Sequence, residues 1–289
     1  MQFDGPEWRI GAKCDFTSTL ISMHTRPAIS VDGFDSSRVI SHGVRTSSSR
    51  FVGAALAVVA LGAHLIMAPA AVAEPAVKTN QKIAFMGDSI TQQGAEPDGY
   101  VTLVIKGLAA AGVKASSIPA GIGGHKSDQM LERLERDALA GKPDWMTLSC
   151  GVNDVWHGAN GVPLDQYKKN ITQIVERCQS AGVQVMILTA TMIGEDEPNE
   201  NNQKLAAYNN FLRALAKEKK CLLADLNADM QKAVAAAGAG QAGVLLTTDG
   251  VHMNPVGNKM MAEGVLKAFG LSAEELELAR KSWQAGAGN

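Results

Sequence analysis

Short apolar segments alternate with amphipathic segments along most of the chain, and this alternation constrains the fold more than any other feature of the sequence. Most of the apolar segments lack the alternation of polar and apolar residues that marks a half-exposed strand. Strands of this kind are typical of a parallel sheet that helices cover on both faces. The expected strands are residues 83–87, 113–118, 145–149, 183–189 and 221–225.

The amphipathic segments have the spacing of apolar residues that a helix requires. The expected helices are residues 99–111, 127–140, 164–181, 201–219, 228–237, 256–269 and 273–283. Gly112 and Gly182 stand where two of these helices would end before the next strand. The alternation of strands and helices therefore predicts an α/β fold, a three-layer α/β/α sandwich around a five-stranded parallel sheet.

An uncharged run at residues 51–73 precedes this pattern. Two arginines lie before the run and it ends in Ala-Val-Ala, so it has the basic flank, the apolar stretch and the small-x-small site of a secretory signal peptide. We expect cleavage after Ala73 and a secreted or periplasmic mature protein. The alternative is an uncleaved anchor, because the run is long enough to cross a bilayer. His64 and Pro69 argue against that alternative.

The run divides the chain into an extension, a signal peptide and a mature domain. Residues 1–50 are polar and lack periodicity, so we expect either a poorly structured tail or a translation start further in, near Met23 or Val44. Residues 74–289 have the length of one globular domain. No cysteine stands directly after the cleavage site, so neither a lipoprotein anchor nor a stable membrane partner is expected after cleavage.

The balance of charges bears on the possible partners. The chain has 27 basic and 29 acidic residues and a net charge of −2, which gives no electrostatic reason to expect nucleic acid as a partner. The mature part keeps an odd number of cysteines, so at least one thiol is unpaired or pairs between chains. These cysteines are Cys150, Cys178 and Cys221. No group of cysteines and histidines has the spacing of zinc ligands, and we expect no metal and no organic cofactor.

Ser89 follows the first expected strand on a turn that contains Gly87. Ligands bind parallel sheets at the carboxyl ends of the strands. A serine on a tight turn there presents its hydroxyl beside free backbone N–H groups, as a nucleophile requires. The motif differs from Gly-x-Ser-x-Gly because Thr91 stands in the second glycine position. Taken alone, an Asp-Ser pair at a turn is more often a helix cap.

A nucleophilic serine needs a base. The mature part has three histidines: His125, His157 and His252. Asp249 stands three residues before His252 in a loop, where its carboxylate can turn back toward the imidazole and fix its tautomer. Asp154 stands at the same spacing before His157, which is the second candidate. The alternative for this late loop, residues 247–254, is a surface segment that leads into a helix capped by Asn254.

Two further loops carry groups that can bind an oxyanion. The glycine-rich segment 121–124 allows close backbone approach and offers N–H donors. Asn153, in the loop after the third strand, carries an amide that can donate to developing negative charge. Either feature alone is more often an ordinary turn.

Together the four segments resemble the GDSL esterases, also called SGNH hydrolases. The matching blocks are Gly87-Asp88-Ser89, Gly124 within Gly121-Ile122-Gly123-Gly124, Gly151-Val152-Asn153-Asp154 and Asp249-Gly250-Val251-His252. They stand in the order of the family and span residues 82–270, nearly the whole mature domain. The resemblance implies the flavodoxin-like SGNH hydrolase fold, in agreement with the five strands expected above.

The resemblance also implies a role for each matched residue. Ser89 would be the nucleophile, His252 the base and Asp249 the residue that orients it. The oxyanion hole would consist of the N–H groups of Ser89 and Gly124 and the amide of Asn153, with the neighbouring Gly123 as the alternative to Gly124. These roles predict a serine esterase that forms an acyl-enzyme intermediate.

The expected substrate is a short-chain ester, above all an acetyl group on a plant or microbial polysaccharide. Export places the enzyme where glycans are met, and the core elements leave little chain for a lid or an acyl tunnel. No helix combines a basic face with an apolar one, as a lipid-surface helix would. Few aromatic residues fall near the loops: Tyr100, Trp156, Tyr167 and Tyr208.

Three other functions remain open at this point. The first is a lysophospholipase or thioesterase that acts on longer acyl chains. The second is a secreted glycan-binding module with a lapsed site, against which the retention of all five site residues argues. The third is acyl transfer to a sugar, which shares the acyl-enzyme with hydrolysis.

Overall fold

The computed structural model of the protein describes residues 74–238 and 245–284. The predicted extension at residues 1–50 and the predicted signal peptide at residues 51–73 lie outside the described residues.

A five-stranded parallel sheet forms the centre of the described part, with the strand order β2-β1-β3-β4-β5. This order agrees with the flavodoxin-like prediction. The strands are β1 (Lys82–Gly87), β2 (Ser116–Gly121), β3 (Trp145–Ser149), β4 (Gln184–Leu188) and β5 (Leu222–Ala224).

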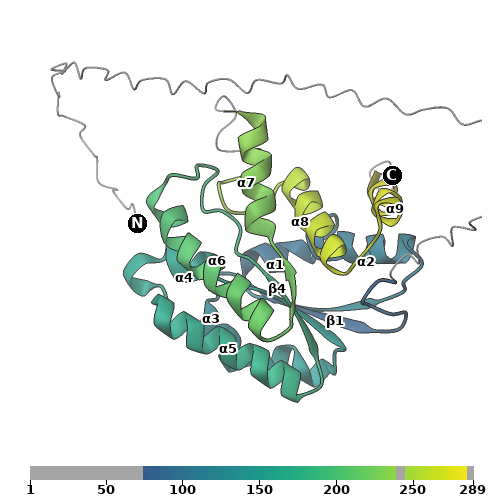
Figure 1. Ribbon diagram of the computed structural model, residues 1–289, viewed down its shortest axis with the longest axis horizontal. Helices are drawn as coiled ribbons and strands as arrows, with labels where there is room; N and C mark the ends of the chain where they lie inside the picture. The colour runs from purple at the N-terminus through teal and green to yellow at the C-terminus, as the bar shows by residue number, and fades with distance from the viewer. Residues whose placement is uncertain (1–73, 239–244, 285–289) are drawn as a thin grey trace, which may run out of the picture. The chain divides into compact units, whose positions relative to one another are not determined.

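Helices cover both faces of the sheet, so the predicted three-layer sandwich is confirmed (Figure 1). One layer consists of α3 (Ser127–Asp137), α5 (Leu164–Ser180) and α6 (Glu200–Glu218). The other consists of α2 (Tyr100–Ala110), α8 (Pro255–Ala268) and α9 (Ala273–Gln284), with α7 (Leu226–Ala237) packed against α8.

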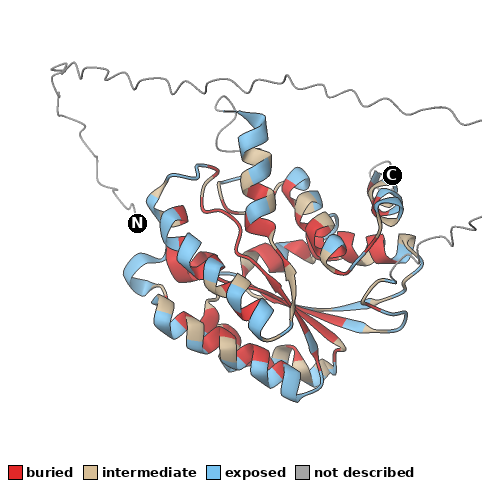
Figure 2. Cartoon of the chain, in the orientation of Figure 1, coloured by how far each residue is buried: buried red, intermediate tan, exposed pale blue. Residues whose placement is uncertain are grey.

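The central strands are buried on both faces because helices pack against each of them. Phe85 in β1, Met146 in β3 and Ile187 in β4 are fully buried. Figure 2 shows the buried residues along the strands and on the sides of the helices that face them. Burial on both faces explains why these strands have continuous apolar sequences instead of alternating ones.

The second strand differs from its prediction. It was expected at residues 113–118, but β2 covers Ser116–Gly121. β2 lies at the edge of the sheet and pairs with β1, in a register from Lys82 opposite Ser116 to Gly87 opposite Gly121. The pairing with β1 therefore sets its bounds. The apolar content does not, since Ser116 and Ser117 are exposed.

Two segments predicted as loops contain short helices. Residues 87–94 include α1 (Ser89–Gly94), and residues 150–158 include α4 (Val152–Trp156). Both are shorter than the window over which helical periodicity is detected. The helix expected at residues 127–140 also ends early, at Asp137, and a 3₁₀ turn at Leu139–Gly141 follows it.

The three cysteines of the described part are free thiols: Cys150, Cys178 and Cys221. In the same ranges, no three His, Cys, Asp or Glu side chains gather closely enough to hold a metal ion. No helix of residues 74–238 and 245–284 is both long enough and apolar enough to cross a bilayer.

Candidate active site

Ser89 is the first residue of α1 and follows directly on the carboxyl end of β1. The start of α1 lies against the end of β2, and this contact requires a glycine: a Cβ on Gly121 would lie 2.2 Å from the backbone nitrogen of Gln92. A Cβ on Gly123 would lie 3.8 Å from the Cβ of Ser89. The close approach therefore brings the glycine-rich loop beside the serine.

A continuous chain of hydrogen bonds joins Ser89 to the late loop. His252 Nε2 lies 2.9 Å from Ser89 Oγ, and His252 Nδ1 lies 2.7 Å from Asp249 Oδ2. The second carboxylate oxygen of Asp249 accepts the backbone N–H groups of Val251 at 3.0 Å and His252 at 2.8 Å. The structure thus brings together the three residues proposed for the triad, although 163 positions separate Ser89 from His252 in the sequence.

The carboxyl group of Asp249 stays ionised over a wide pH range. Its partial burial acts to raise its pKa. The backbone N–H of His252, the His252 ring and the N–H of Val251 together outweigh this effect and lower the pKa to about 2. An ionised carboxylate at Nδ1 fixes the imidazole tautomer that leaves Nε2 free to accept the serine proton.

His157, the second candidate for the base, does not pair with Asp154. Its Nδ1 lies 2.9 Å from the backbone oxygen of Asn153. The Asp154 carboxylate is buried and accepts instead from the N–H of Ser127 at 3.0 Å and from its hydroxyl at 2.6 Å. Asp154 therefore fixes the start of α3 and does not orient a base.

The ring of His125, the third histidine, bonds to an arginine. Its Nδ1 accepts a hydrogen bond from Arg133 Nε at 3.1 Å. Partial burial, together with the nearby positive charge of Arg133, lowers the pKa of His125. A neutral imidazole whose Nδ1 accepts a hydrogen bond is held in one tautomer.

Arg133 is a structural residue of the site that the sequence analysis missed. It is buried, and its terminal nitrogens donate to the backbone oxygens of Ala120 and Gly87, each at 2.8 Å. It therefore joins the ends of β1 and β2, from which the serine and the glycine loop emerge. A signal was present, because Arg133 falls among the buried positions of α3 with Met130 and Leu134.

The structure distinguishes the two glycines proposed for the oxyanion hole. The N–H of Gly123 donates to Gln92 Oε1 at 2.9 Å. The N–H of Gly124 has no hydrogen-bond acceptor among residues 74–238 and 245–284. Of the two glycines, Gly124 is therefore the one whose backbone N–H can donate to an oxyanion.

The amide of Asn153 lies between two acceptors. Its Nδ2 is 3.3 Å from Asp88 Oδ2 and 3.3 Å from the backbone oxygen of His125. Both distances are long for hydrogen bonds, so neither contact holds the amide strongly. The amide is directed at the start of α1, because Asp88 stands next to Ser89.

Asp88 is an unusual group at this position, a buried carboxyl directly before the serine. Burial raises its pKa to about 6, and the repulsion of Asp154 adds to this effect. The N–H of Ile90, which donates to Asp88 Oδ1 at 3.0 Å, and the charge of His252 oppose it. Asp88 caps α1 and lies beside the Asn153 amide, and its carboxyl group is buried away from water.

The buried carboxyl of Asp88 makes stability depend on pH. Its folded pKa of about 6 lies above the ordinary aspartate pKa of 3.8. The contribution of Asp88 to the stability of the fold is thus fully present below about pH 4, and it is lost as the pH rises through 6. An asparagine at this position does not titrate, so the stability of Asp88→Asn lacks this pH dependence. Between pH 4 and 8 we expect the free energy of unfolding of the wild type to fall by roughly 3 kcal/mol relative to that of the variant.

Denaturant unfolding of both proteins at a series of pH values measures this difference. A difference between wild type and Asp88→Asn that stays constant over this range would show that Asp88 does not titrate as a buried carboxyl.

Comparison with known proteins agrees with this arrangement. The profile of the GDSL-like Lipase/Acylhydrolase family matches residues 85–260. The acetylxylan esterase of Geobacillus stearothermophilus is 26% identical over 216 residues, which are 67% of this chain and 96% of the relative. Esterase TesA of Pseudomonas aeruginosa is 25% identical over 174 residues, 60% of this chain and 79% of the relative.

Solved structures give the same result. The crystal structure of the acetyl xylan esterase AlAXEase superposes with a TM-score of 0.61 at 34% identity, over 65% of this chain and 98% of that one.

A three-layer sandwich with a hydrogen-bonded serine, histidine and aspartate at the carboxyl end of the sheet has the architecture of a serine ester hydrolase. The family match extends over more than half of the chain. The chain belongs to the GDSL-like lipase/acylhydrolase family and is a serine carboxylic ester hydrolase of the GDSL/SGNH type.

Proposed function

We propose that the protein hydrolyses short-chain esters, above all acetyl esters of carbohydrates, with Ser89 as nucleophile, His252 as base and Asp249 as its orienting acid. The observation that carries the chemistry is the unbroken chain from Ser89 Oγ to His252 at 2.9 Å and on to Asp249 at 2.7 Å. The first distance lies in the range that proton transfer between a nucleophile and its base requires. The second is that of a hydrogen bond that orients the base.

The proposed reaction has two halves. Ser89 Oγ attacks the ester carbonyl carbon while its proton passes to His252 Nε2. The tetrahedral intermediate collapses, the bond to the alcohol breaks, and His252 returns the proton to the leaving alcohol. Water then attacks the acyl-enzyme by the same route and releases the carboxylic acid and free Ser89. Throughout, ionised Asp249 stabilises the positive imidazole.

The oxyanion of the intermediate would be bound by the N–H groups of Ser89 and Gly124 and by the amide of Asn153. The free N–H of Gly124 supports its part in this group. The long contact between the Asn153 amide and the His125 carbonyl supports the part of Asn153, since the oxyanion can replace that neutral acceptor at little cost. The remaining amide hydrogen keeps its contact with Asp88.

The relatives support an acetylated carbohydrate as substrate. Two of the similar proteins are named acetylxylan esterases, and the chain covers nearly the full length of both. Export through the uncharged run at residues 51–73 would place the enzyme where such polysaccharides occur. We therefore propose a secreted or periplasmic location.

Trp156 offers a surface for a sugar ring. Of the four aromatic residues near the loops, Tyr100, Tyr167 and Tyr208 are buried, whereas Trp156 is 45% exposed. It stands three residues after Asn153 in α4, and residues at this spacing share one side of a helix. Its ring lies beside the His157 imidazole, with centroids 6.3 Å apart at 31°. An exposed flat ring on the oxyanion side of α4 suits the apolar face of a pyranose.

A chain-length series tests the proposed substrate. For acetate, octanoate and palmitate esters of one alcohol, we expect kcat/KM to be highest for acetate, and we expect acetate release from acetylated xylan. Purified enzyme with a pH-stat or chromatographic assay of the free acid measures both. A preference for palmitate would favour a lysophospholipase or thioesterase instead. Failure to release acetate from any acetylated glycan would reject the carbohydrate part alone.

Trp156→Ala sharpens the carbohydrate part of this test. The variant should raise KM for acetylated xylo-oligosaccharides by about three- to tenfold, which is the worth of one aromatic contact. It should leave kcat/KM for 4-nitrophenyl acetate within twofold of wild type, because a small ester does not reach the ring. Leu278→Ala is the matched control, since Leu278 is 48% exposed on α9. Equal effects on both substrates would contradict the sugar contact.

A further inference from the structure

Glu195 is a buried carboxylate with an unusual set of partners. It lies in the segment between β4 and α6, and within the described part of the chain its hydrogen-bond donors belong to residues 245–247, at the start of the late loop. Its Oε2 accepts the N–H of Leu245 at 2.6 Å. Its Oε1 accepts the N–H groups of Leu246 and Thr247 at 2.8 and 2.7 Å, and the Thr247 hydroxyl at 2.6 Å. One side chain thus binds four donors of three consecutive residues.

These bonds keep the carboxylate charged. Burial acts to raise the pKa of Glu195, but the Thr247 hydroxyl and the three backbone N–H groups outweigh it and lower the pKa. Hydrogen bonds to an ionised acceptor are shorter and stronger than neutral ones. The segment 245–247 is therefore held to Glu195 more firmly than an ordinary loop contact would hold it.

The constraint extends from Thr247 to the triad residues. Thr247 Oγ1, which donates to Glu195, accepts the N–H of Gly250 at 3.1 Å. Thr247 also forms an antiparallel bridge with Met253. Asp249 and His252 lie inside this short hairpin, so fixing Thr247 fixes the turn that carries both.

A second contact joins the same two segments. The N–H of Gly194, the residue before Glu195, donates to the backbone oxygen of Gly250 at 2.6 Å. Gly250 has a φ of +91°, a conformation that only glycine adopts easily, and it separates Asp249 from Val251. The segment that carries Glu195 therefore contacts the late loop on both sides of Asp249.

Glu195 itself is held in a rigid setting. The side chain of Asn202, in the first turn of α6, accepts the N–H of Ile193 at 2.8 Å. Its Nδ2 donates to the backbone oxygens of Ile193, Gly194 and Asp196. α6 packs on the sheet, so these bonds connect the scaffold to Glu195 and Glu195 to the late loop.

We propose that Glu195 is a positioning residue for ester hydrolysis, and that it holds the late loop so that His252 Nε2 stays within hydrogen-bond distance of Ser89 Oγ. The inference rests on the proposed triad. Glu195 touches neither Ser89 nor the His252 ring, so it acts on the rate through Thr247 and the turn at Gly250.

Glu195→Ala removes all four acceptor contacts. A displacement of about 1 Å at a reacting group can cost 10²-fold in rate, so we expect kcat for 4-nitrophenyl acetate to fall by about 10- to 100-fold. KM should change by less than about twofold, because the substrate does not contact Glu195. Assays well below the melting temperature of each variant separate this effect from unfolding.

Glu195→Gln is the conservative variant, and it tests the positioning role of Glu195 if the alanine variant does not fold. The amide oxygen of Gln can keep the three bonds to Oε1, whereas the amide N–H₂ faces the N–H of Leu245 and leaves two donors opposed. We expect kcat to fall by about 3- to 10-fold, with KM again unchanged. Activity should thus increase in the order Ala, Gln, Glu.

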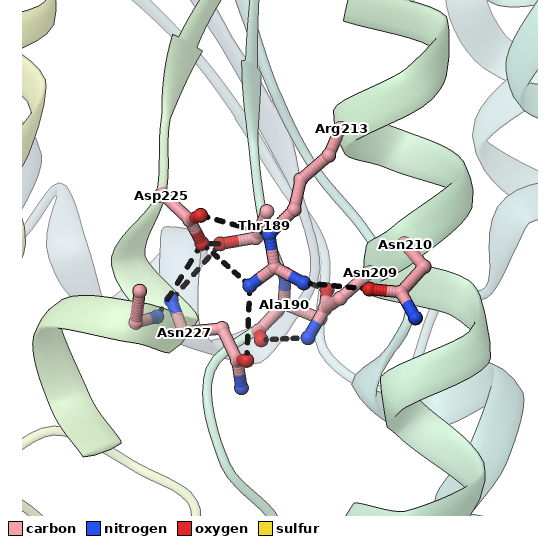
Figure 3. Close-up of polar contacts among 8 residues, drawn as sticks. Thr189, Ala190, Asn209, Asn210, Arg213, Asp225 and Asn227 are labelled. Carbon is pink, nitrogen blue, oxygen red and sulfur yellow. Dashed lines mark hydrogen bonds and ion pairs between the residues drawn. The ribbon is translucent and has the colours of Figure 1, made fainter. Parts of the chain in front are cut away.

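Asp225→Asn is the matched control. Asp225 accepts from Arg213 at 2.8 Å and from the Thr189 hydroxyl at 2.9 Å, as Figure 3 shows. Its remaining bond, to the N–H of Ala228, caps α7, so none of its contacts reaches residues 245–254. The control should lose stability but keep kcat within about twofold of wild type.

A spectroscopic readout reports the loop directly. In ¹⁵N-histidine-labelled protein, the Nδ1–H of His252 that bonds to Asp249 should give a protected downfield proton signal in wild type and Asp225→Asn. It should broaden or disappear in the Glu195 variants.

The outcomes separate this inference from the proposed function. Unchanged kcat in both Glu195 variants would overturn the positioning role, and so would an equal loss of kcat in Asp225→Asn. Full activity of Ser89→Ala would instead reject the proposed triad, whatever the Glu195 variants do.

Discussion

Replacement of Ser89 by alanine is expected to lower kcat by about 10⁴-fold or more while the fold is retained. The hydroxyl of Ser89 is the proposed nucleophile, and without it the hydrogen-bond chain through His252 would have no nucleophile to activate. The side chain is small and sits at the first residue of α1, so its loss leaves no large cavity. Steady-state assays with a short-chain ester measure the loss.

The control for this variant is Ser180→Ala, at the exposed end of α5. It should retain wild-type kcat. Circular dichroism should show the same helix content and melting curve for both variants. More than a few per cent of wild-type activity in Ser89→Ala would show that the nucleophile is elsewhere.

His252→Ala should reduce kcat about as much as Ser89→Ala, and the double variant should lose little more than either single one. Residues that act as one catalytic unit are far from additive, because the first loss already disables the second. The 2.9 Å contact between His252 Nε2 and Ser89 Oγ is the reason to expect this behaviour. Comparison of kcat for the two single variants and the double variant measures the coupling.

His157→Ala is the matched histidine variant and should lose much less. The ring of His157 bonds to the Asn153 carbonyl and not to the serine. A larger loss in His157→Ala than in His252→Ala would move the base to the loop after β3. Losses that multiply in the double Ser89/His252 variant would show that the two residues act independently.

The architecture was predictable because the strongest signals in the sequence are local. Four of the five strands fall within two residues of their predicted bounds. β1, β3 and β4 have continuous apolar sequences because they are buried on both faces, and β5, at one edge of the sheet, is apolar as well. β2 was displaced because an edge strand takes its bounds from pairing with β1, and pairing leaves no apolar signal in exposed residues such as Ser116.

The residues of the site were accessible to sequence reasoning only as separate loops. Four short blocks gave the candidates, and parallel strands bring such loops to one edge. The blocks did not show that Ser89 and Asn153 stand on the short helices α1 and α4. Nor could they separate Gly123 from Gly124, because that distinction depends on the side chain of Gln92.

The supporting residues were the least predictable part of the site. Glu195 lies 50 or more positions before its hydrogen-bond partners, and no local pattern marks a carboxylate that will bind a distant backbone. Asp88 belongs to a recognised block, but its burial and raised pKa depend on Asp154 and on the packing of α1. Such roles follow from tertiary contacts and emerge only when the whole fold is present.

The most direct test of the central claim is to locate the nucleophile chemically. A fluorophosphonate ester reacts with a serine that a neighbouring base has activated, and it leaves a stable adduct that tandem mass spectrometry can assign to one residue. We expect a single adduct per chain on the peptide that contains Ser89, with loss of activity in proportion to labelling and no adduct in His252→Ala on the same time scale. An unmodified Ser89 in active enzyme, or an adduct on any other residue, would contradict the proposed mechanism.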